Sequence, residues 1–369
     1  MIEALVTEPG TPHSARVERV AEEAAVADAV PIRVLEVGVC GTDREISEGL
    51  FGTSPPGESR LVLGHELFGV VERDGGGFTR GDFVTATVRR SCGRCVACAQ
   101  GSPDSCLTGD YVERGITRLH GFARELVLED PEQLIPVPRS LGRLGVLAEP
   151  GSICARGIRH ARAVAGRQPW PGERALVLGA GAIGMLSTYL LRLEGVEVWT
   201  AARGPGGTDR AELVAACGAR YVSTRETPLA ALAEEIGGFD LVVEATGNAQ
   251  VMAETIGLLR RNGVACLLGL DARERGVTLD GRTLGIDTVL QNRALLGSVN
   301  AHRQDWFAAV ESLDRALARW PDAVERLVGL RVPLDRFAEA FAHAGVKATL
   351  VLSEGDAIPR PSGRGSGRL

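Results

Sequence analysis

Aromatic side chains make up only 4% of this 369-residue chain, so few groups are available to stack on nucleic-acid bases. Basic residues are not in excess either, because 41 Lys and Arg stand against 47 Asp and Glu, for a net charge of -6. The sequence shows no basic stripe, no apolar run of membrane-spanning length and no signal-peptide pattern in residues 1–6. We therefore expect no nucleic-acid partner, no membrane partner and a cytoplasmic location.

Cysteine use bears on the redox compartment. Four of the eight cysteines fall within fifteen positions, between 92 and 106. A chain of this length does not need such a cluster as a disulfide framework, so metal-bound thiolates in a reducing cytoplasm explain it better. Apolar residues at 44% and charged residues at 24% are typical of a globular protein, and the length suits one large domain or two.

Residues 1–150 have the pattern of a small all-β domain. Short runs of apolar and β-branched residues recur at 3–7, 30–39, 61–72, 83–88 and 122–127. Gly and Pro are frequent in the loops between these runs. This spacing predicts a small barrel or sandwich.

The pattern changes near Leu147, where strands begin to alternate with helices, as in parallel βαβ units. Strands are predicted at 174–179, 196–201, 219–223, 241–245, 263–269 and 294–299, with helices that include 182–193 and 209–216. Helices at 304–320 and 334–343 and a strand at 348–352 follow, and we expect this ending to return to the first domain. The Gly-, Ser-, Pro- and Arg-rich tail 359–369 is expected to be disordered.

A metal site is predicted around Cys40 and His65. Cys40 ends an apolar alternating run, and His65 and Glu66 follow a short strand and turn at 61–64. A thiol, an imidazole and a carboxylate suit a divalent metal with nitrogen and sulfur ligands, usually zinc, and ligands at strand ends leave room for an open coordination position. The alternative is that Cys40 is a small buried residue and His65 a hydrogen-bonded core histidine.

A second zinc site is predicted in the polar loop 91–107. Its four thiolates would form a closed tetrahedral shell with no position for substrate, so this zinc would be structural. It would hold together a lobe that has little core of its own. The alternative is four unrelated cysteines. The four thiols belong to Cys92, Cys95, Cys98 and Cys106.

A nucleotide site is predicted at Gly179-Ala180-Gly181-Ala182-Ile183-Gly184, between an expected strand and an expected helix. Gly179 permits the tight turn, Gly181 lets the backbone approach a pyrophosphate, and Gly184 allows close packing of helix on strand. The helix N-terminus offers free N–H groups to the anion. The alternative is a Gly-rich turn in an ordinary α/β sheet.

The end of the second βαβ strand indicates which nicotinamide cofactor is used. An NAD site has an acid there to bind the ribose hydroxyls, whereas this chain has none and carries Arg203, which could hold a 2′-phosphate with help from Arg210. We predict a preference for NADP with NAD possible; the alternative is a solvated arginine. Further cofactor contacts are assigned to Ala182, Ile183, Thr246, Gly269 and Ser298.

These motifs occur in the order and spacing of the zinc-containing medium-chain alcohol dehydrogenase superfamily, which the chain resembles over nearly its whole length. The resemblance implies a GroES-like β-barrel catalytic domain at 1–150 and 301–369 and a doubly wound Rossmann domain at 151–300. It also implies a homodimer or homotetramer that pairs through Rossmann-domain edge strands. The residues that carry it are Cys40-Gly41-Thr42-Asp43, Gly64-His65-Glu66-x-x-Gly69, Gly81-Asp82-Phe83-Val84, the four-cysteine lobe and the nucleotide motif.

Within the superfamily the chain is most similar to the glucose 1-dehydrogenase branch, on the runs 40–46, 60–66, 113–116 and 297–301. The branch implies that Cys40, His65 and Glu149 hold the catalytic zinc, with Glu66 close to the metal as an exchangeable ligand. It also implies that Glu113 and Asn300 contact sugar hydroxyls.

The expected chemistry is oxidation of an aldose to its lactone, with two zinc ions per chain. Zinc would acidify the substrate hydroxyl, Thr42 would accept its proton first, and hydride would pass to the nicotinamide. Three alternatives remain open: the same reaction on a cyclitol or an amino-sugar precursor, a zinc-independent reductase, and an inactive binding protein with the same fold.

Overall fold

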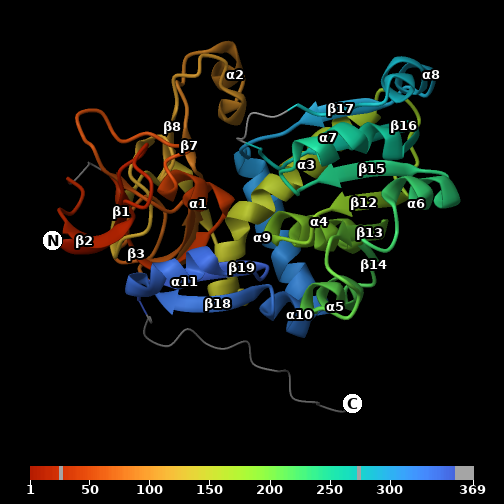
Figure 1. Ribbon diagram of the computed structural model, residues 1–369. Coiled ribbons are helices and arrows are strands. Elements are labelled where there is room, and N and C mark those ends of the chain that lie inside the picture. The colour runs from red at the N-terminus through yellow and green to blue at the C-terminus, as the bar shows by residue number, and fades with distance from the viewer. Residues whose placement is uncertain (25–27, 272–275, 354–369) are drawn as a thin grey trace. The chain divides into compact units, whose positions relative to one another are not determined.

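The computed structural model describes residues 1–24, 28–271 and 276–353. The chain divides into two compact units, drawn with their elements in Figure 1: one holds Met1–Glu149 and the chain from Leu330 onward, and the other holds Pro150–Gly329. The tail at 359–369 lies outside the described residues. No helix in the described part is both long enough and apolar enough to span a bilayer.

The first unit is built on β3 (Val30–Val39), which pairs antiparallel with β5 (Glu66–Val71), β10 (Leu126–Glu129) and β19 (Lys347–Val351). The pairing of β19 with β3 shows that the end of the chain returns to this unit, as expected. The other strands are β1 (Ile2–Thr7), β2 (Arg16–Val20), β4 (Leu61–Val62), β6 (Phe83–Ala86), β7 (Arg89–Arg90), β8 (Val112–Arg114), β9 (Arg118–Leu119), β11 (Leu134–Pro136) and β18 (Val328–Pro333).

A register shift in β3 decides which of its side chains face the core. The pairing with β5 is irregular between Val34 and Glu36. Ile32 and Val34 belong to the core before this bulge, and Val37 and Val39 belong to it afterwards. One extra residue moves the inward set from even to odd positions, and so sets the register in which β3 reaches Cys40.

Two of the strand ranges predicted from the sequence are wrong. The run 61–72 is divided into β4 and β5, because Gly64 adopts a φ of +88° that ends the first strand before His65. The run 122–127 is strand only from Leu126. Phe122 instead donates a backbone hydrogen bond to the Gly64 carbonyl at 2.8 Å, so this segment covers the turn.

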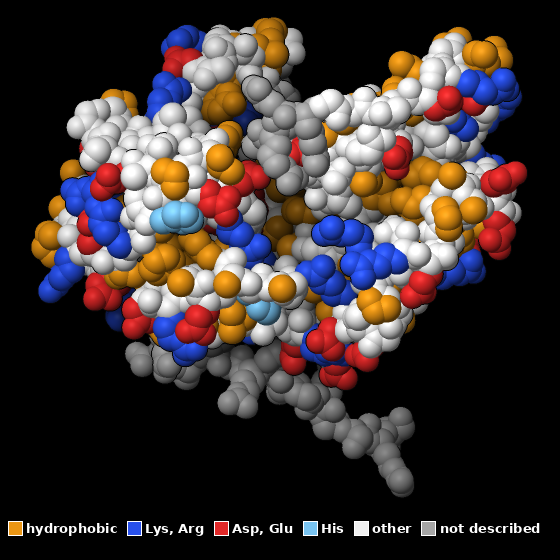
Figure 2. All heavy atoms as spheres, in the orientation of Figure 1, with side chains coloured by type: hydrophobic (Ala, Val, Ile, Leu, Met, Phe, Trp, Pro, Cys, Tyr) orange, Lys and Arg blue, Asp and Glu red, His pale blue; other side chains and the backbone are white. Residues whose placement is uncertain are grey.

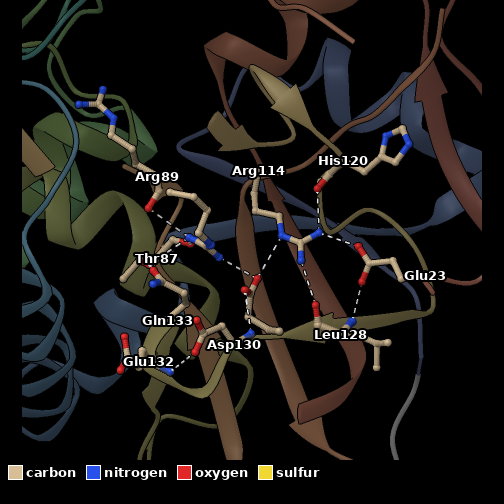
Figure 3. Close-up of polar contacts among 12 residues, drawn as sticks. Glu23, Thr87, Arg89, Arg114, His120, Leu128, Asp130, Glu132 and Gln133 are labelled. Carbon is tan, nitrogen blue, oxygen red and sulfur yellow. Dashed lines mark hydrogen bonds and ion pairs between the residues drawn. The ribbon is translucent and has the colours of Figure 1, made fainter. Parts of the chain in front are cut away.

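A buried ionic cluster stabilises the first unit (Figure 3). Glu23 accepts hydrogen bonds from Arg114 at 2.7 Å, from Arg124 at 2.6 Å and from the Leu128 amide at 2.7 Å. On its other side Arg114 donates to Glu129 at 3.1 Å. Burial alone would raise the pKa of Glu23, but the two guanidinium groups outweigh it and lower this pKa below 4.5. Buried charges of this kind are tolerated only when they are paired.

Replacing Glu23 with Gln should make the first unit less stable at neutral pH, by about 3 kcal/mol, because two buried arginines lose their shared carboxylate. Since the pKa of Glu23 is lower in the folded state, its contribution is fully present above the unfolded-state value and is lost as the pH falls through the folded-state value. Urea unfolding of wild type and Glu23→Gln from pH 7 to pH 3 should therefore show a difference that shrinks in acid. A difference that is independent of pH would contradict this assignment.

The second unit is a six-stranded parallel sheet in the order β14-β13-β12-β15-β16-β17. In chain order the strands are β12 (Arg174–Leu178), β13 (Glu197–Ala202), β14 (Arg220–Ser223), β15 (Phe239–Glu244), β16 (Leu259–Leu267) and β17 (Ala294–Gly297). The spatial order is therefore 3-2-1-4-5-6, which is that of a doubly wound dinucleotide-binding sheet with its switch point between β12 and β15.

Helices cover both faces of this sheet (Figure 1). One face packs on α4 (Ala182–Leu193), where Thr200 and Thr188 share a buried hydrogen bond at 2.7 Å. On the other face Leu176 and Trp199 belong to a core that includes Leu232 of α6 (Leu229–Ile236). The remaining helices are α3 (Ala148–Ala165), α5 (Asp209–Ala216), α7 (Ala249–Glu254), α8 (Thr288–Leu290), α9 (Arg303–Arg319) and α10 (Pro321–Glu325).

The division between the units differs from the sequence-based boundary, which placed residues 301–329 in the first domain. In the structure they belong to the second unit, because α9 packs on α4. The aromatic ring of Trp320, directly after α9, makes an edge-to-face contact with Tyr189 of α4. The chain therefore returns to the first unit only at Leu330.

Candidate active site

Cys40 and His65 lie at the ends of neighbouring strands in the first unit. Cys40 follows β3 and caps α1 (Gly41–Ser47), and its Sγ accepts a hydrogen bond from the Thr42 amide at 3.2 Å. His65 precedes β5, which pairs with β3 so that Glu66 is opposite Gly38. This register brings His65 Nε2 to 3.1 Å from Cys40 Sγ.

Asp43 orients both of these side chains. Its Oδ2 accepts a hydrogen bond from the Cys40 amide at 3.0 Å, and its Oδ1 lies 3.4 Å from His65 Nδ1. Burial alone would raise the pKa of Asp43, but His65 and the Cys40 amide lower it, so the carboxylate is ionised. A histidine with a carboxylate at Nδ1 presents Nε2 to a metal, and the carboxylate fixes the tautomer and the ring.

Glu66 forms a buried ion pair with Lys347, the first residue of β19. Its side chain lies directly over Gly38, where an added Cβ would come within 1.9 Å of Glu66 Oε2. Residue 38 must therefore be glycine for Glu66 to hold this position. Burial would lower the pKa of Lys347, but Glu66 and Cys40 raise it, so Lys347 is a cation in the interior of the unit.

Glu149, the second residue of α3, completes the cluster. Burial raises its pKa to about 7, while the neighbouring His65 opposes this shift. Candidate ligand atoms fall into two groups, each within 4.8 Å: one holds Cys40, Asp43 and His65, and the other holds His65, Glu66 and Glu149. His65 belongs to both groups, whereas Cys40 and Glu149 do not share one. The predicted ligands are thus gathered around His65.

The composition of this cluster fits a divalent cation. A thiol, three carboxyl groups and an imidazole are buried or half-buried together, with Lys347 as the only lysine among them. Uncompensated negative charge in a protein interior is unfavourable, and a bound cation would neutralise it. The mixture of sulfur, nitrogen and oxygen donors is the one that zinc accepts.

The four-cysteine lobe also has the donors of a zinc site. The Sγ atoms of Cys92, Cys95, Cys98 and Cys106 all lie within 4.8 Å of one another, with Cys95 as the N-cap of α2 (Val96–Ala99) and Cys98 within that helix. Hydrogen bonds from Thr108 and from the amides of Arg94 and Cys95 lower the pKa of the Cys92 thiol to about 7. Four thiols and no carboxylate fit a closed, structural zinc shell.

The three glycines of the nucleotide motif have different surroundings. A Cβ at Gly184 would lie 1.8 Å from the Gly179 carbonyl oxygen, and one at Gly179 would lie 2.9 Å from the Ala245 carbonyl oxygen. A Cβ at Gly181 would meet nothing within 4 Å. Gly181 is also the N-cap residue of α4, and no side chain makes a capping hydrogen bond there. The fold therefore requires two of the glycines, and the third leaves open space at a helix N-terminus, where a pyrophosphate fits.

The other predicted cofactor residues follow the carboxyl ends of neighbouring strands in the second unit. Thr246 follows β15, Gly269 follows β16 and Ser298 follows β17, so they lie along the same edge as the glycine loop. The Ser298 hydroxyl is buried without a hydrogen bond among the described residues, which leaves it available to a ligand.

Arg203 directly follows β13, where no acid is present, and its side chain is exposed. Arg210 lies one residue into α5 and is half-buried. Figure 2 shows a group of basic side chains over α4 and the start of α5. This surface offers the cations of Arg203 and Arg210 to a group bound at the end of β13, although Asp209 and Glu212 also lie in the first turn of α5.

The two predicted sugar contacts lie in different units. Glu113 on β8 is not a solvated surface acid: its Oε1 accepts a hydrogen bond from Arg89 Nε at 2.9 Å, and its side chain is only 14% exposed. Asn300 lies after β17 with a positive φ of 64°, a conformation that asparagine tolerates better than most residues.

Comparison with known proteins agrees with both halves of this description. Residues 26–139 match the alcohol dehydrogenase GroES-like domain, and residues 142–352 match the glucose dehydrogenase C-terminus. The chain is 41% identical to a glucose 1-dehydrogenase of Methanocella arvoryzae over 92% of its own length and 96% of that protein. The chain belongs to the glucose 1-dehydrogenase family.

Two further relatives support this membership of the glucose 1-dehydrogenase family. A glucose 1-dehydrogenase of Caldivirga maquilingensis is 39% identical over 95% of this chain and 99% of that protein. The solved structure of Haloferax mediterranei glucose dehydrogenase, in complex with NADP, Zn and gluconolactone, superposes with a TM-score of 0.87 at 31% identity. It covers 95% of this chain and 99% of that one.

Sequence reasoning missed three residues of this glucose 1-dehydrogenase family member, Asp43, Lys347 and Arg89. Asp43 could have been found, because it lies three residues after Cys40, at the spacing of a helix capping box. Arg89 gave no such signal, since Glu113 lies 24 positions away. Lys347 is the only lysine of the sequence, but its partner Glu66 lies 281 positions away and no local pattern identifies it.

The glycine motif provides a matched pair of variants. Gly181→Ala should fold as wild type, because its Cβ enters open space, yet it should weaken dinucleotide binding at least about tenfold by blocking the approach to the backbone. Gly184→Ala should destabilise the second unit itself, because its Cβ overlaps the Gly179 carbonyl. Thermal unfolding and calorimetric titration with NADP separate the two effects. Equal loss of stability in both variants would show that position 181 is also structural.

Proposed function

We propose that this protein is a zinc-dependent glucose 1-dehydrogenase that oxidises an aldose at its anomeric carbon and prefers NADP. The observation that carries the proposal is the Cys40–His65 pair at 3.1 Å, surrounded by buried carboxylates. Membership of the glucose 1-dehydrogenase family and the likeness to a complex with NADP, Zn and gluconolactone support it. The first unit then has the role of the catalytic domain and the second that of the cofactor domain.

Cys40, His65 and Glu149 would hold the catalytic zinc, with Glu66 as an exchangeable ligand. Zinc in this position supplies Lewis acidity, which makes a substrate hydroxyl more acidic and stabilises negative charge on its oxygen. The chain's own residues prepare the site for it: the Thr42 amide hydrogen-bonds to Cys40 Sγ, and Asp43 holds the His65 ring. Lys347 restrains Glu66 on the far side of the cluster.

Thr42 is the first acceptor for the substrate proton in this proposal. Its hydroxyl belongs to the residue directly after Cys40, at the first turn of α1, so it is held by the same cap that holds the thiol. A hydroxyl can accept one proton while it donates its own, which suits it to a relay toward solvent.

The glycine loop and Arg203 would bind the cofactor. The free amides at the start of α4 would hold the pyrophosphate, and the guanidinium of Arg203 would hold the 2′-phosphate. Arg210, the second residue of α5, would add a second positive charge. In this arrangement the backbone amides that bind the pyrophosphate would bind NAD and NADP equally. Only the basic side chains would distinguish the two cofactors.

A homodimer or homotetramer is part of the proposal. β17 is the last strand in the sheet order, so the outer side of its backbone has no strand partner within the described part of the second unit. Large exposed apolar side chains lie on and around it, and Figure 2 shows such side chains gathered near α8. They are Leu284, Ile286, Val289, Leu290 and Leu295.

All eight cysteines are free thiols, which supports a cytoplasmic location.

Replacement of Cys40 with Ala tests the proposal directly. The variant should lose at least about a hundredfold in glucose oxidation, because the Lewis acid is lost with its thiolate ligand. Zinc content should fall from two ions per chain to one, and the NADP dissociation constant should stay as in wild type. A panel of aldoses, cyclitols and amino sugars, assayed for NADPH formation with the wild type, identifies the substrate. Full activity of the Cys40→Ala variant would contradict the proposal.

Replacement of Arg203 with Ala tests the cofactor assignment. The KM for NADP should rise about tenfold, as expected for the loss of a charge-assisted hydrogen bond, while the KM for NAD should not change. The control is Arg319→Ala, an exposed arginine at the end of α9, which should alter neither value. Equal increases for both cofactors would show that Arg203 does not distinguish them.

A further inference from the structure

Arg89 and Glu113 form a cross-strand pair in the first unit. β7 and β8 run antiparallel with Arg89 directly opposite Glu113, and the Arg89 Nε to Glu113 Oε1 distance is 2.9 Å. The two side chains are only 8% and 14% exposed. An ion pair this sheltered from water is screened by salt much less than one on an open surface.

The neighbouring residues on the two strands face the other way. Side chains alternate along a strand, so Arg90 and Arg114 lie on the opposite face of this small sheet. Both bind Glu129 there, at 2.7 and 3.1 Å, within the buried ionic cluster. Figure 3 shows the Arg89 side chain directed away from the group around Arg114 and Glu23. The pair of Arg89 and Glu113 is therefore separate from the cluster that stabilises the fold.

Arg89 is also bound to the four-cysteine lobe. Its Nη1 donates to the carbonyl of Asp104 at 2.9 Å, two residues before Cys106, and its guanidinium stacks on Tyr111 at 3.9 Å from the ring centroid. Asp104 is the only buried residue among 92–107. The lobe has no apolar core of its own, so its shape depends on its four thiols and on this anchor.

The residue directly after β8 contacts the turn before His65. A Cβ at Gly115 would lie 2.4 Å from the Gly64 carbonyl oxygen, so the backbones touch at this point. Glu113 lies two residues before Gly115 and has one oxygen fixed by Arg89. Its second oxygen, Oε2, makes no hydrogen bond among the described residues and can accept one from a hydroxyl.

We propose that Arg89 is a positioning residue for the sugar: it fixes Oε1 of Glu113, leaves Oε2 for a substrate hydroxyl, and couples this carboxylate to the metal-bound lobe through Asp104. The inference rests on the proposed function, since Glu113 is the sugar contact that the family resemblance implies. In this proposal the structural zinc determines the affinity of the enzyme for the sugar as well as the stability of the four-cysteine lobe.

The first experiment measures glucose kinetics of the zinc-loaded enzyme. Arg89→Met should raise the KM for glucose about tenfold, with a smaller change in kcat and none in the KM for NADP. Arg89→Lys should fall between this variant and wild type, because an ammonium does not reproduce the planar fork that reaches both Glu113 and Asp104. The matched control is Arg94→Met, an exposed arginine of the same lobe that should behave as wild type.

A double-mutant cycle separates positioning from a general structural effect. If Arg89 acts through Glu113, Arg89→Met should add less than about twofold to the KM increase that Glu113→Gln causes alone. Additive effects in the double variant would overturn the proposal, as would an unchanged glucose KM in Arg89→Met.

The second experiment does not depend on glucose oxidation. Zinc release from the lobe to a chromogenic chelator is followed in the Cys40→Ala background, where the lobe holds the remaining ion. Arg89→Met should accelerate release about tenfold and Glu113→Gln severalfold, with no change in Arg94→Met, because coupling between two groups is reciprocal. Unchanged release rates would overturn the proposed link. If release is accelerated in these variants but the protein with Cys40 intact does not oxidise glucose, the proposed function fails while the link between lobe and carboxylate stands.

Discussion

The site depends on the contacts that the His65 ring makes on its two sides. One ring nitrogen lies beside the Cys40 thiol, and the other faces the Asp43 carboxylate. Asp43 also binds the amide of Cys40, so a single side chain fixes both the thiol and the imidazole. Every other member of the cluster is placed relative to this ring, since His65 belongs to both groups of candidate ligands.

The surrounding backbone makes that arrangement possible through close contacts at glycine. Gly38 leaves the space that Glu66 occupies, and Gly64, with a φ of +88°, turns the chain directly before His65. Gly115 and Gly121 then lie against the Gly64 backbone, where an added Cβ would come within 2.4 and 2.3 Å of its carbonyl oxygen. Contacts this short admit no side chain, and they place the chain that follows β8, the strand of Glu113, against the turn directly before His65.

Local patterns in the sequence predict the second unit better than the first. The helices at 182–193 and 209–216 are found at the predicted residues. Gly181 is the N-cap of the first, and Thr208, whose side chain accepts a hydrogen bond from the Ala211 amide, is the N-cap of the second. The strand order also follows from chain order once the βαβ pattern is recognised. In the first unit, a break at Gly64 and a bulge after Val34 depend on contacts with distant strands, which no local window contains.

The candidate site also depends on contacts between residues far apart in the sequence, which local patterns do not predict. Residue type and spacing are sufficient to propose the thiol and imidazole ligands, because few other roles bring such groups to strand ends together. They are not sufficient to find Arg89, one cation among 41 in the sequence, or to show which acid is paired with Lys347, the only lysine of the sequence. Both cations are buried beside a carboxylate, and burial is a property of the folded chain alone. Because a buried charge is stable only beside its partner, each of the two cations reports on the acid that it holds, Glu66 at the metal cluster and Glu113 at the edge of the cysteine lobe.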